Sequence, residues 1–158
     1  MNVHSRTTRA PEEEVVDLLR EVNGMMKAEL RERAEDMGLP PFTRHVVVLL
    51  RVTREPGITM NELGRLLTIP KSQISLLAAD LVRDGLVRKV EDASDQRLVR
   101  VLPTAAGRRE AARWRAAFRT LVGQRVRALT AVDVEHLVDG LRALRAAYAP
   151  ASPAARTA

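Results

Sequence analysis

The chain has 158 residues, of which 46% are hydrophobic and 29% are charged, as is typical of a protein with a packed core. Its longest apolar run, Val46 to Leu50, excludes a membrane helix, and the absence of cysteine excludes disulfides, thiolate metal sites and cysteine-based redox sensing. The net charge of +6 suggests an acidic partner such as nucleic acid.

The first forty residues predict a flexible arm followed by one long helix. Residues 1–11 are polar and contain no apolar segment, so we expect no secretory signal there. Apolar residues then recur at helical spacing from Val15 to Ala34, and Glu12–Glu14 suit the positive end of a helix dipole. Gly38-Leu39-Pro40-Pro41 ends the pattern, which places this helical region at residues 12–40.

Two further helices are predicted on either side of a turn. Thr43 is the expected N-cap of a helix whose residues 46–52 are almost entirely apolar, so this helix is expected to be buried. Glu55-Pro56-Gly57 has the composition of a turn. Thr59 and Glu62 have the spacing of a capping box, which predicts the start of a short helix.

A third helix and a change of periodicity follow. Thr68-Ile69-Pro70 interrupts the short helix, and the next helix is expected from about Lys71 to Asp84, with Gly85 as its left-handed end. Two β-like runs then flank the polar residues 92–96, which predicts a hairpin with a five-residue loop.

The C-terminal third is predicted to be helical. Thr104 is the expected cap of a long helix that reaches about Leu129, and Thr130 with Asp133 begins another. Together they form a helical region at residues 104–149, and the short tail at 150–158 is expected to be disordered.

The positive charge is concentrated in this C-terminal region. Residues 104–129 hold seven basic and one acidic side chain, a net +6, whereas residues 59–103 have a net charge of only +1. The overall charge therefore does not by itself locate a nucleic-acid site.

Two helices joined by a tight turn and followed by a hairpin describe a winged helix-turn-helix lobe, here at residues 41–103. In such a lobe the second helix enters the major groove, while the hairpin reaches along the DNA backbone. Short polar side chains near the start of that helix can approach base edges, and glutamine suits adenine. These side chains are Lys71, Ser72, Gln73 and Ser75.

Three motifs of this lobe occur together. They are Arg54–Thr59 before the short helix, Gly85-Leu86-Val87 at the start of the hairpin, and Asp95-Gln96-Arg97 within it. With these motifs, residues 42–108 resemble the DNA-binding core of the MarR family of bacterial winged helix-turn-helix transcription regulators. The resemblance predicts a mainly α-helical fold with a small β-hairpin wing and long N- and C-terminal dimerisation helices.

The resemblance also implies a function. It implies a homodimer, joined through residues 12–40 and 104–149, that binds a palindromic operator in double-stranded DNA. The expected protein is a cytoplasmic, ligand-responsive repressor with no enzymatic activity, no cofactor and no association with membranes. Two alternatives are a non-specific architectural DNA-binding protein and a winged-helix adaptor that binds proteins.

The resemblance assigns roles to the wing. It implies that Arg97 enters the minor groove, whose narrow form attracts arginine, and that Asp95 fixes the Arg97 side chain. Alternatively, these two residues only pair across an exposed turn. The resemblance further implies that the contacts to phosphates, or within the wing, are made by Arg88, Lys89 and Arg100.

Two residues depart from the family pattern. Leu76 lies on the helix predicted to enter the major groove, at a position where the family often has a polar residue. It either packs internally, which we favour, or touches a thymine methyl group. Pro70 stands where a serine or threonine cap is common, so we expect this helix to begin with proline at its first position.

A small aromatic or phenolic effector is a further implication of the resemblance, bound between the winged lobe and the dimer helices. Met25, Met26, His45 and Trp114 are candidates for lining such a pocket, although residues of these types at helical spacing more often form ordinary core. The three histidines are scattered, so no metal site is predicted.

The arginine-rich helix at residues 107–127 has three interpretations. Its arginines form a solvated face, they pair with Glu12–Glu14 and other acids of the first helix across the dimer, or the start of the helix lies near DNA. We favour the first two. Enzyme motifs and aromatic stacking platforms for single strands are both missing from the sequence.

Overall fold

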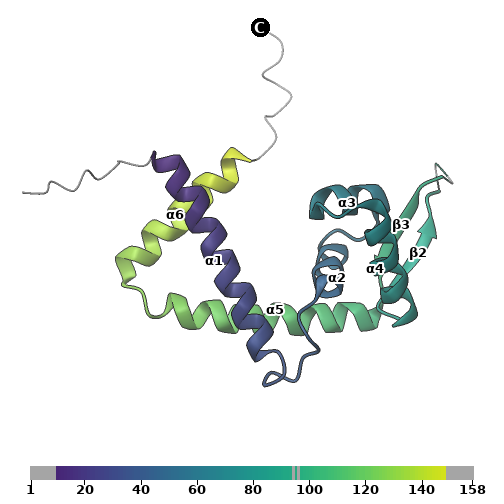
Figure 1. Cartoon of the computed structure of the whole chain (residues 1–158), viewed down its shortest axis with the longest axis horizontal. Helices are drawn as coiled ribbons and strands as arrows, with labels where there is room; N and C mark the ends of the chain where they lie inside the picture. The colour runs from purple at the N-terminus through teal and green to yellow at the C-terminus, as the bar shows by residue number, and fades with distance from the viewer. Residues whose placement is uncertain (1–9, 94, 96, 149–158) are drawn as a thin grey trace, which may run out of the picture. The chain divides into compact units, whose positions relative to one another are not determined.

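The computed structural model describes residues 10–93, 95 and 97–148, so the predicted arm lies almost entirely, and the predicted tail entirely, outside the described residues. The chain forms two compact units that divide after Leu121. The first unit contains α1 (Pro11–Arg33), α2 (Arg44–Arg54), β1 (Ile58–Thr59), α3 (Met60–Leu67), α4 (Lys71–Arg83), β2 (Val87–Glu91), β3 (Val99–Pro103) and most of α5 (Ala105–Val126) (Figure 1). The second unit contains the end of α5 and α6 (Ala131–Ala147). This mainly helical chain with a small antiparallel sheet confirms the predicted fold class.

Side-chain caps begin three of the helices at the predicted residues. The Thr59 hydroxyl accepts a hydrogen bond from the Glu62 amide at 3.3 Å, while the Glu62 carboxylate accepts one from the Thr59 amide at 2.9 Å. Thr104 and Thr130 cap α5 and α6 in the same way, through the amides three residues later. Thr43 precedes α2 as predicted, but its side chain makes no capping hydrogen bond. Local sequence therefore sets the start of half of the six helices in the described part of the chain.

The sheet has one strand more than the predicted hairpin. Its order is β1-β3-β2, with Ile58 opposite Val101 and Lys89 opposite Val101 on the other side. Strand β1 has only two residues, and Thr59 ends it while also capping α3. The third strand therefore joins the wing to the beginning of the helix-turn-helix.

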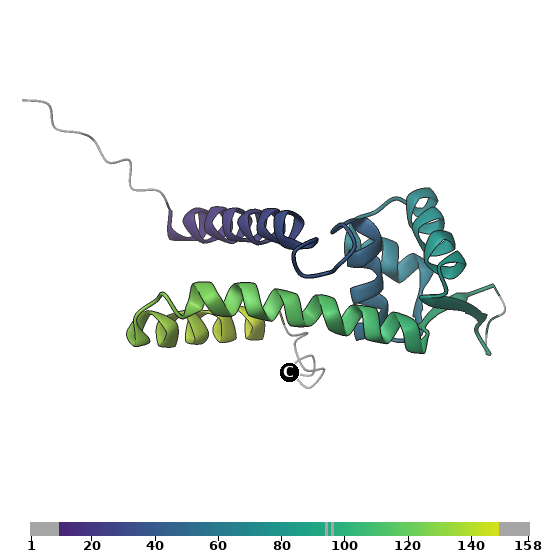
Figure 2. The same cartoon turned by 90° about the horizontal axis from the view of Figure 1, so that it is seen from below.

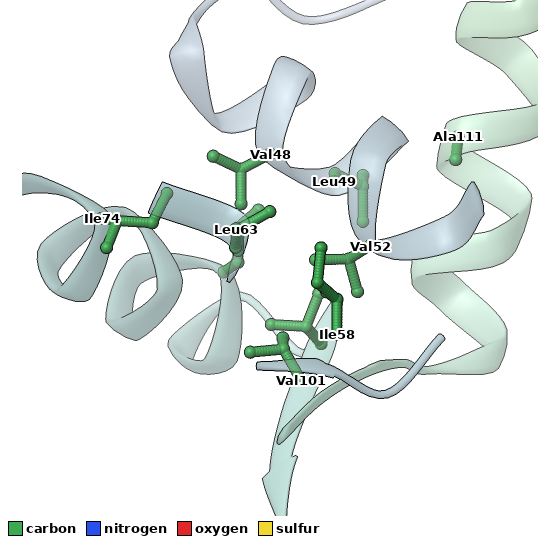
Figure 3. Close-up of a cluster of buried hydrophobic side chains, with 10 residues drawn as sticks. Val48, Leu49, Val52, Ile58, Leu63, Ile74, Val101 and Ala111 are labelled. Carbon is green, nitrogen blue, oxygen red and sulfur yellow. The ribbon is translucent and has the colours of Figure 1, made fainter. Parts of the chain in front are cut away.

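A single hydrophobic cluster holds the winged lobe together (Figure 3). Its buried side chains come from α2, α3, α4, the three strands and the first half of α5. They are Val48, Leu49, Val52, Ile58, Leu63, Ile74, Leu81, Val87, Val101 and Ala111. Because each element contributes to this cluster, burial of apolar surface fixes the helix pair against the wing.

A second cluster connects α1 and α5 within the first unit. Leu30 and Ala34 pack with Trp114, whose ring meets that of Phe42 edge-on at a centroid distance of 5.2 Å. Leu30 is the only buried residue of α1 itself, whereas the apolar residues of its N-terminal half are exposed. None of the helices in the described part of the chain has the length and apolar character required to cross a membrane.

The start of α5 lies unusually close to the beginning of the wing. The Thr104 amide donates to the Leu86 carbonyl at 3.0 Å, and the Thr104 hydroxyl donates to the Gly85 carbonyl at 2.7 Å, with the Leu86 carbonyl 3.1 Å from the same hydroxyl. Gly107 follows one turn later, and a Cβ atom there would lie only 1.9 Å from the same carbonyl oxygen. Figure 2 shows α5 running from the hairpin past the lobe toward α1. Only glycine at position 107 permits this approach.

Several arginines of α5 bind their own chain. Arg108 donates to the Pro103 carbonyl at 3.0 Å, and Arg115 donates to the Thr53 hydroxyl at 3.0 Å. Arg113 donates to the Gly38 carbonyl and also pairs with Glu110 at 2.9 Å. These arginines tie α5 to neighbouring loops and helices, a use that the sequence interpretation did not include.

Candidate nucleic-acid interface

The turn between α3 and α4 sets the direction of α4. Thr68 ends α3 in the left-handed conformation, with φ of 54°, and the Ile69 amide donates to the Gly64 carbonyl at 2.9 Å. Pro70 is the N-cap of α4, one position before the expected first turn, and Lys71 is the first helical residue. The proline still begins the helix because its fixed φ suits an extended residue before a helix and it needs no amide partner.

The outer face of α4 carries all four side chains predicted to read bases. Lys71, Ser72, Gln73 and Ser75 are exposed, while the opposite face buries Ile74, Ala78 and Leu81 in the lobe core. Leu76 belongs to the outer face, where 67% of its surface is exposed, so the favoured prediction that it packs internally is wrong. The helical period explains the error, because position 76 is one turn from Ser72 and adjacent to Ser75 on the solvent side.

Two polar contacts attach α4 to the beginning of α2. The Arg44 guanidinium donates to the Gln73 side-chain oxygen at 2.9 Å. Two turns further along α4, the Asp80 carboxylate lies 3.0 Å from Nε2 of His45 and also pairs with Arg83 at 2.8 Å. The hydrogen bond from His45 is the main cause that lowers the pKa of Asp80, and the charge of Arg83 adds to it. Asp80 is therefore held in its ionised form.

Arg44 and Asp80 were not among the predicted site residues. Their role follows from contacts between residues 29 and 35 positions apart, which no local pattern indicates. Gln73 could be identified from the sequence because it lies near the start of α4. The hydrogen bond by which Arg44 orients the Gln73 amide could not be predicted in this way.

A chain of contacts runs from the sheet toward the tip of the wing. Arg100 donates through Nε to the buried Asp92 carboxylate and through a terminal nitrogen to the Gly57 carbonyl at 2.8 Å. The other Asp92 oxygen accepts from the Asp95 amide at 3.1 Å, and the Asp95 carboxylate accepts from the Arg97 amide at 3.0 Å. The guanidinium of Arg100 thus links Asp92 at the base of the wing to the Gly57 carbonyl.

Asp95 acts on the backbone of Arg97, which differs from the expected contact with its side chain. Among the described residues, no ion pair joins the two side chains, so the simple pairing across the turn is not seen either. Arg97 itself is exposed, as are Arg88 and Lys89 on β2. Asp92, the buried acid at the centre of this chain of contacts, was treated as an ordinary loop residue by the sequence interpretation.

The four candidate effector residues have three different surroundings. Met25 is 67% exposed and Met26 is half-buried, both on α1, whereas Trp114 is only 1% exposed within the second cluster. His45 binds Asp80 on α4. In the described part of the chain, no group of three or more metal-ligating side chains is placed to hold a metal ion.

The pair of helices α3 and α4, the exposed polar face of α4 and the hairpin held by Arg100 define a winged helix-turn-helix protein. Comparison with known proteins identifies its family. Residues 38–109 match the sequence model of the MarR family. This match of the winged lobe confirms the resemblance, and the chain has the fold of MarR family transcription regulators. No curated protein sequence matches the chain at a significant level.

Solved structures of similar fold cover most of the chain. A MarR family transcriptional regulator from Rhodococcus sp. RHA1 is 22% identical with a TM-score of 0.66, and the match covers 87% of this chain and 96% of that one. A probable transcriptional regulator from Pseudomonas aeruginosa is 25% identical with a TM-score of 0.61, covering 85% and 99%. A complex of MepR from S. aureus with DNA gives 19% identity and a TM-score of 0.61, covering 84% and 96%.

Proposed function

We propose that this protein is a sequence-specific regulator that binds double-stranded DNA as a homodimer and represses transcription. The observation that carries the proposal is one lobe that presents both an exposed polar helix face and an exposed basic hairpin. Lys71, Ser72, Gln73 and Ser75 supply the helix face, and Arg88, Lys89 and Arg97 supply the hairpin. These two surfaces suit a major groove and the adjacent backbone.

In this proposal, α4 reads bases and the wing reads shape. The Gln73 amide is oriented by Arg44 at 2.9 Å and would offer its donor to a base edge. The Arg97 guanidinium would enter the minor groove from a backbone that Asp95 holds. Arg100 is assigned to support of the wing, because it is bound to Asp92 and Gly57.

Exposed apolar surface supports the homodimer. In α1, Val15, Leu18, Leu19 and Val22 are exposed, and α6 has no buried residue although it carries Val132, Leu137 and Leu141. A row of exposed apolar side chains on each of these two helices, taken separately, marks that helix as an interaction site. A homodimer with two lobes would also match a near-palindromic site, with half-sites about one helical turn apart.

The S. aureus MepR complex, whose fold resembles this chain, contains DNA, and this agrees with the proposal. Cytoplasmic location and response to a small aromatic effector are parts of the same proposal. The buried Trp114 has an indole N–H without a hydrogen-bond partner among the described residues, so it is the atom through which an effector with an acceptor group would bind. Its fluorescence, from the only tryptophan of the chain, gives a direct binding assay.

The test begins with selection of bound sequences from a random duplex library, followed by gel shifts over a range of salt concentrations. We expect a near-palindromic site that is preferred over random duplex at physiological salt. Equal binding to both would indicate the architectural alternative, and no binding at all would indicate the adaptor. Light scattering of the free protein should give the mass of a dimer.

Arg97→Ala tests the wing. Loss of a minor-groove arginine from each lobe is expected to weaken binding to the selected site at least about tenfold, because each such contact contributes about 1–3 kcal/mol. The matched control is Arg145→Ala, which removes the same charge from exposed surface on α6. Parent-like binding by Arg97→Ala would remove the wing from the proposal.

A further inference from the structure

Leu76 stands out on the outer face of α4 because its surroundings are polar or small. It is 67% exposed, and its neighbours on that face are Ser72, Gln73, Ser75 and Ala79, all exposed. The apolar face that anchors the helix is complete without it, since Ile74, Ala78 and Leu81 fill the core. Leu76 therefore contributes nothing to the packing of its own lobe that would explain a leucine.

Most of the side chains around Leu76 are shorter than leucine, and the longer Gln73 accepts a hydrogen bond from Arg44 at 2.9 Å. Beyond Cα, alanine extends by one heavy atom and serine by two, whereas leucine extends by three. The nearest acidic group one turn further on, Asp80, is already bound by His45 and Arg83. The centre of this face thus offers an apolar tip flanked by two hydroxyl groups.

One group of duplex DNA matches such a tip. Among the base edges in the major groove, only thymine presents an apolar substituent, its C5 methyl group. A leucine in the middle of a helix that enters this groove would meet base edges, while the neighbouring serines would accept or donate hydrogen bonds to bases on either side.

We propose that Leu76 contacts the C5 methyl group of a thymine in each half-site and thereby selects thymine at that position. This inference rests on the proposed function, because it requires α4 to lie in the major groove. It adds a specific residue and a specific base to that proposal.

The test removes the methyl group from the DNA and the side chain from the protein separately. In the selected duplex, each thymine is replaced in turn by deoxyuridine, which lacks only the methyl group, and dissociation constants are measured for the parent and for Leu76→Ala. The matched control is Leu66→Ala, which truncates another exposed leucine, on α3. Since Leu76 is exposed, its truncation should leave the thermal unfolding temperature nearly unchanged.

At one thymine per half-site, we expect the parent to bind the deoxyuridine duplex about fourfold more weakly, as for one buried methyl group. Replacement in both half-sites should cost about fifteenfold. Leu76→Ala should bind the two duplexes equally, whereas Leu66→Ala should discriminate like the parent.

Three results would overturn the inference. In the first, no thymine of the selected site shows a methyl effect; in the second, the effect persists in Leu76→Ala. In both cases the recovery of a selected site keeps the proposed function intact. In the third, no selected site is recovered, and the proposed function fails together with the inference. A changed oligomeric mass of Leu76→Ala without a change in thymine discrimination would instead identify Leu76 as a protein contact.

Discussion

Replacement of Gly107 by alanine should destabilise the protein, although the same change usually stabilises a helix. The added Cβ would lie 1.9 Å from the Leu86 carbonyl oxygen and 3.3 Å from Cδ1 of Leu49, whereas real Cβ contacts are essentially never shorter than 3.0 Å. The wing strand and α5 must therefore separate by at least about 1.1 Å. That movement stretches two hydrogen bonds of Thr104, from its amide to the Leu86 carbonyl at 3.0 Å and from its hydroxyl to the Gly85 carbonyl at 2.7 Å.

The expected cost follows from these contacts. Forced backbone shifts in a packed site cost about 1–3 kcal/mol, and weakening two hydrogen bonds adds about 1 kcal/mol, while the helix preference of alanine returns about 1 kcal/mol. We expect the free energy of unfolding to fall by about 2 kcal/mol, measured by urea denaturation at fixed protein concentration. The control is Gly24→Ala in α1, where a Cβ meets no atom within 4 Å, so stability should rise by up to about 1 kcal/mol. If Gly107→Ala were as stable as Gly24→Ala, the close approach of α5 to the wing would be refuted.

Three further substitutions test the winged lobe and the second hydrophobic cluster. Thr68→Gly should raise the free energy of unfolding by up to about 1 kcal/mol, because glycine accepts a φ of 54° without strain; a loss of stability in urea would contradict this. The pKa of Asp80 is lowered in the folded state, so the stability that its ionised carboxylate contributes is present above the ordinary carboxyl pKa and is lost as pH falls. The difference in free energy of unfolding between the parent and Asp80→Asn should therefore shrink from pH 7 to pH 3. A constant difference would disprove the contribution of the ionised carboxylate. Trp114→Ala should cost about 3–5 kcal/mol in denaturation followed by circular dichroism, since the ring is 1% exposed, and a cost below about 1 kcal/mol would show that the second cluster is not packed.

Local signals explain why so much of the lobe could be predicted. Capping residues such as Thr59 and Thr104 act within three or four positions, and Gly85 ends α4 with the expected left-handed φ of 68°. Alternation of apolar residues likewise located the hairpin. These features depend on neighbouring residues alone, so the sequence contains all the information that they need.

The features that escaped prediction depend on distant partners. Strand β1 consists of two residues and exists because β3 pairs with it, and a run this short has no periodicity to detect. The hydrogen bonds between Arg44 and Gln73, and between Arg100 and Asp92, also join residues that only the folded lobe brings together. Leu76 was misplaced for another reason, since the hydrophobic character of a residue predicts burial only on average and surface leucines are common.

The arginines of α5 that bind their own carbonyl and hydroxyl groups have a consequence for how DNA binding would respond to ions. The cations that the proposal places against DNA are Lys71, Arg88, Lys89 and Arg97, four in each lobe and eight in the proposed homodimer; Arg83 and Arg100 pair with Asp80 and Asp92 instead. Release of one counterion for each neutralised phosphate would give a slope of about −7 for the logarithm of affinity against the logarithm of salt concentration. Several arginines of α5 are hydrogen-bonded to groups of their own chain. Counterion release would therefore be set by the cations on α4 and the wing, and the net charge of the chain would have little influence on it.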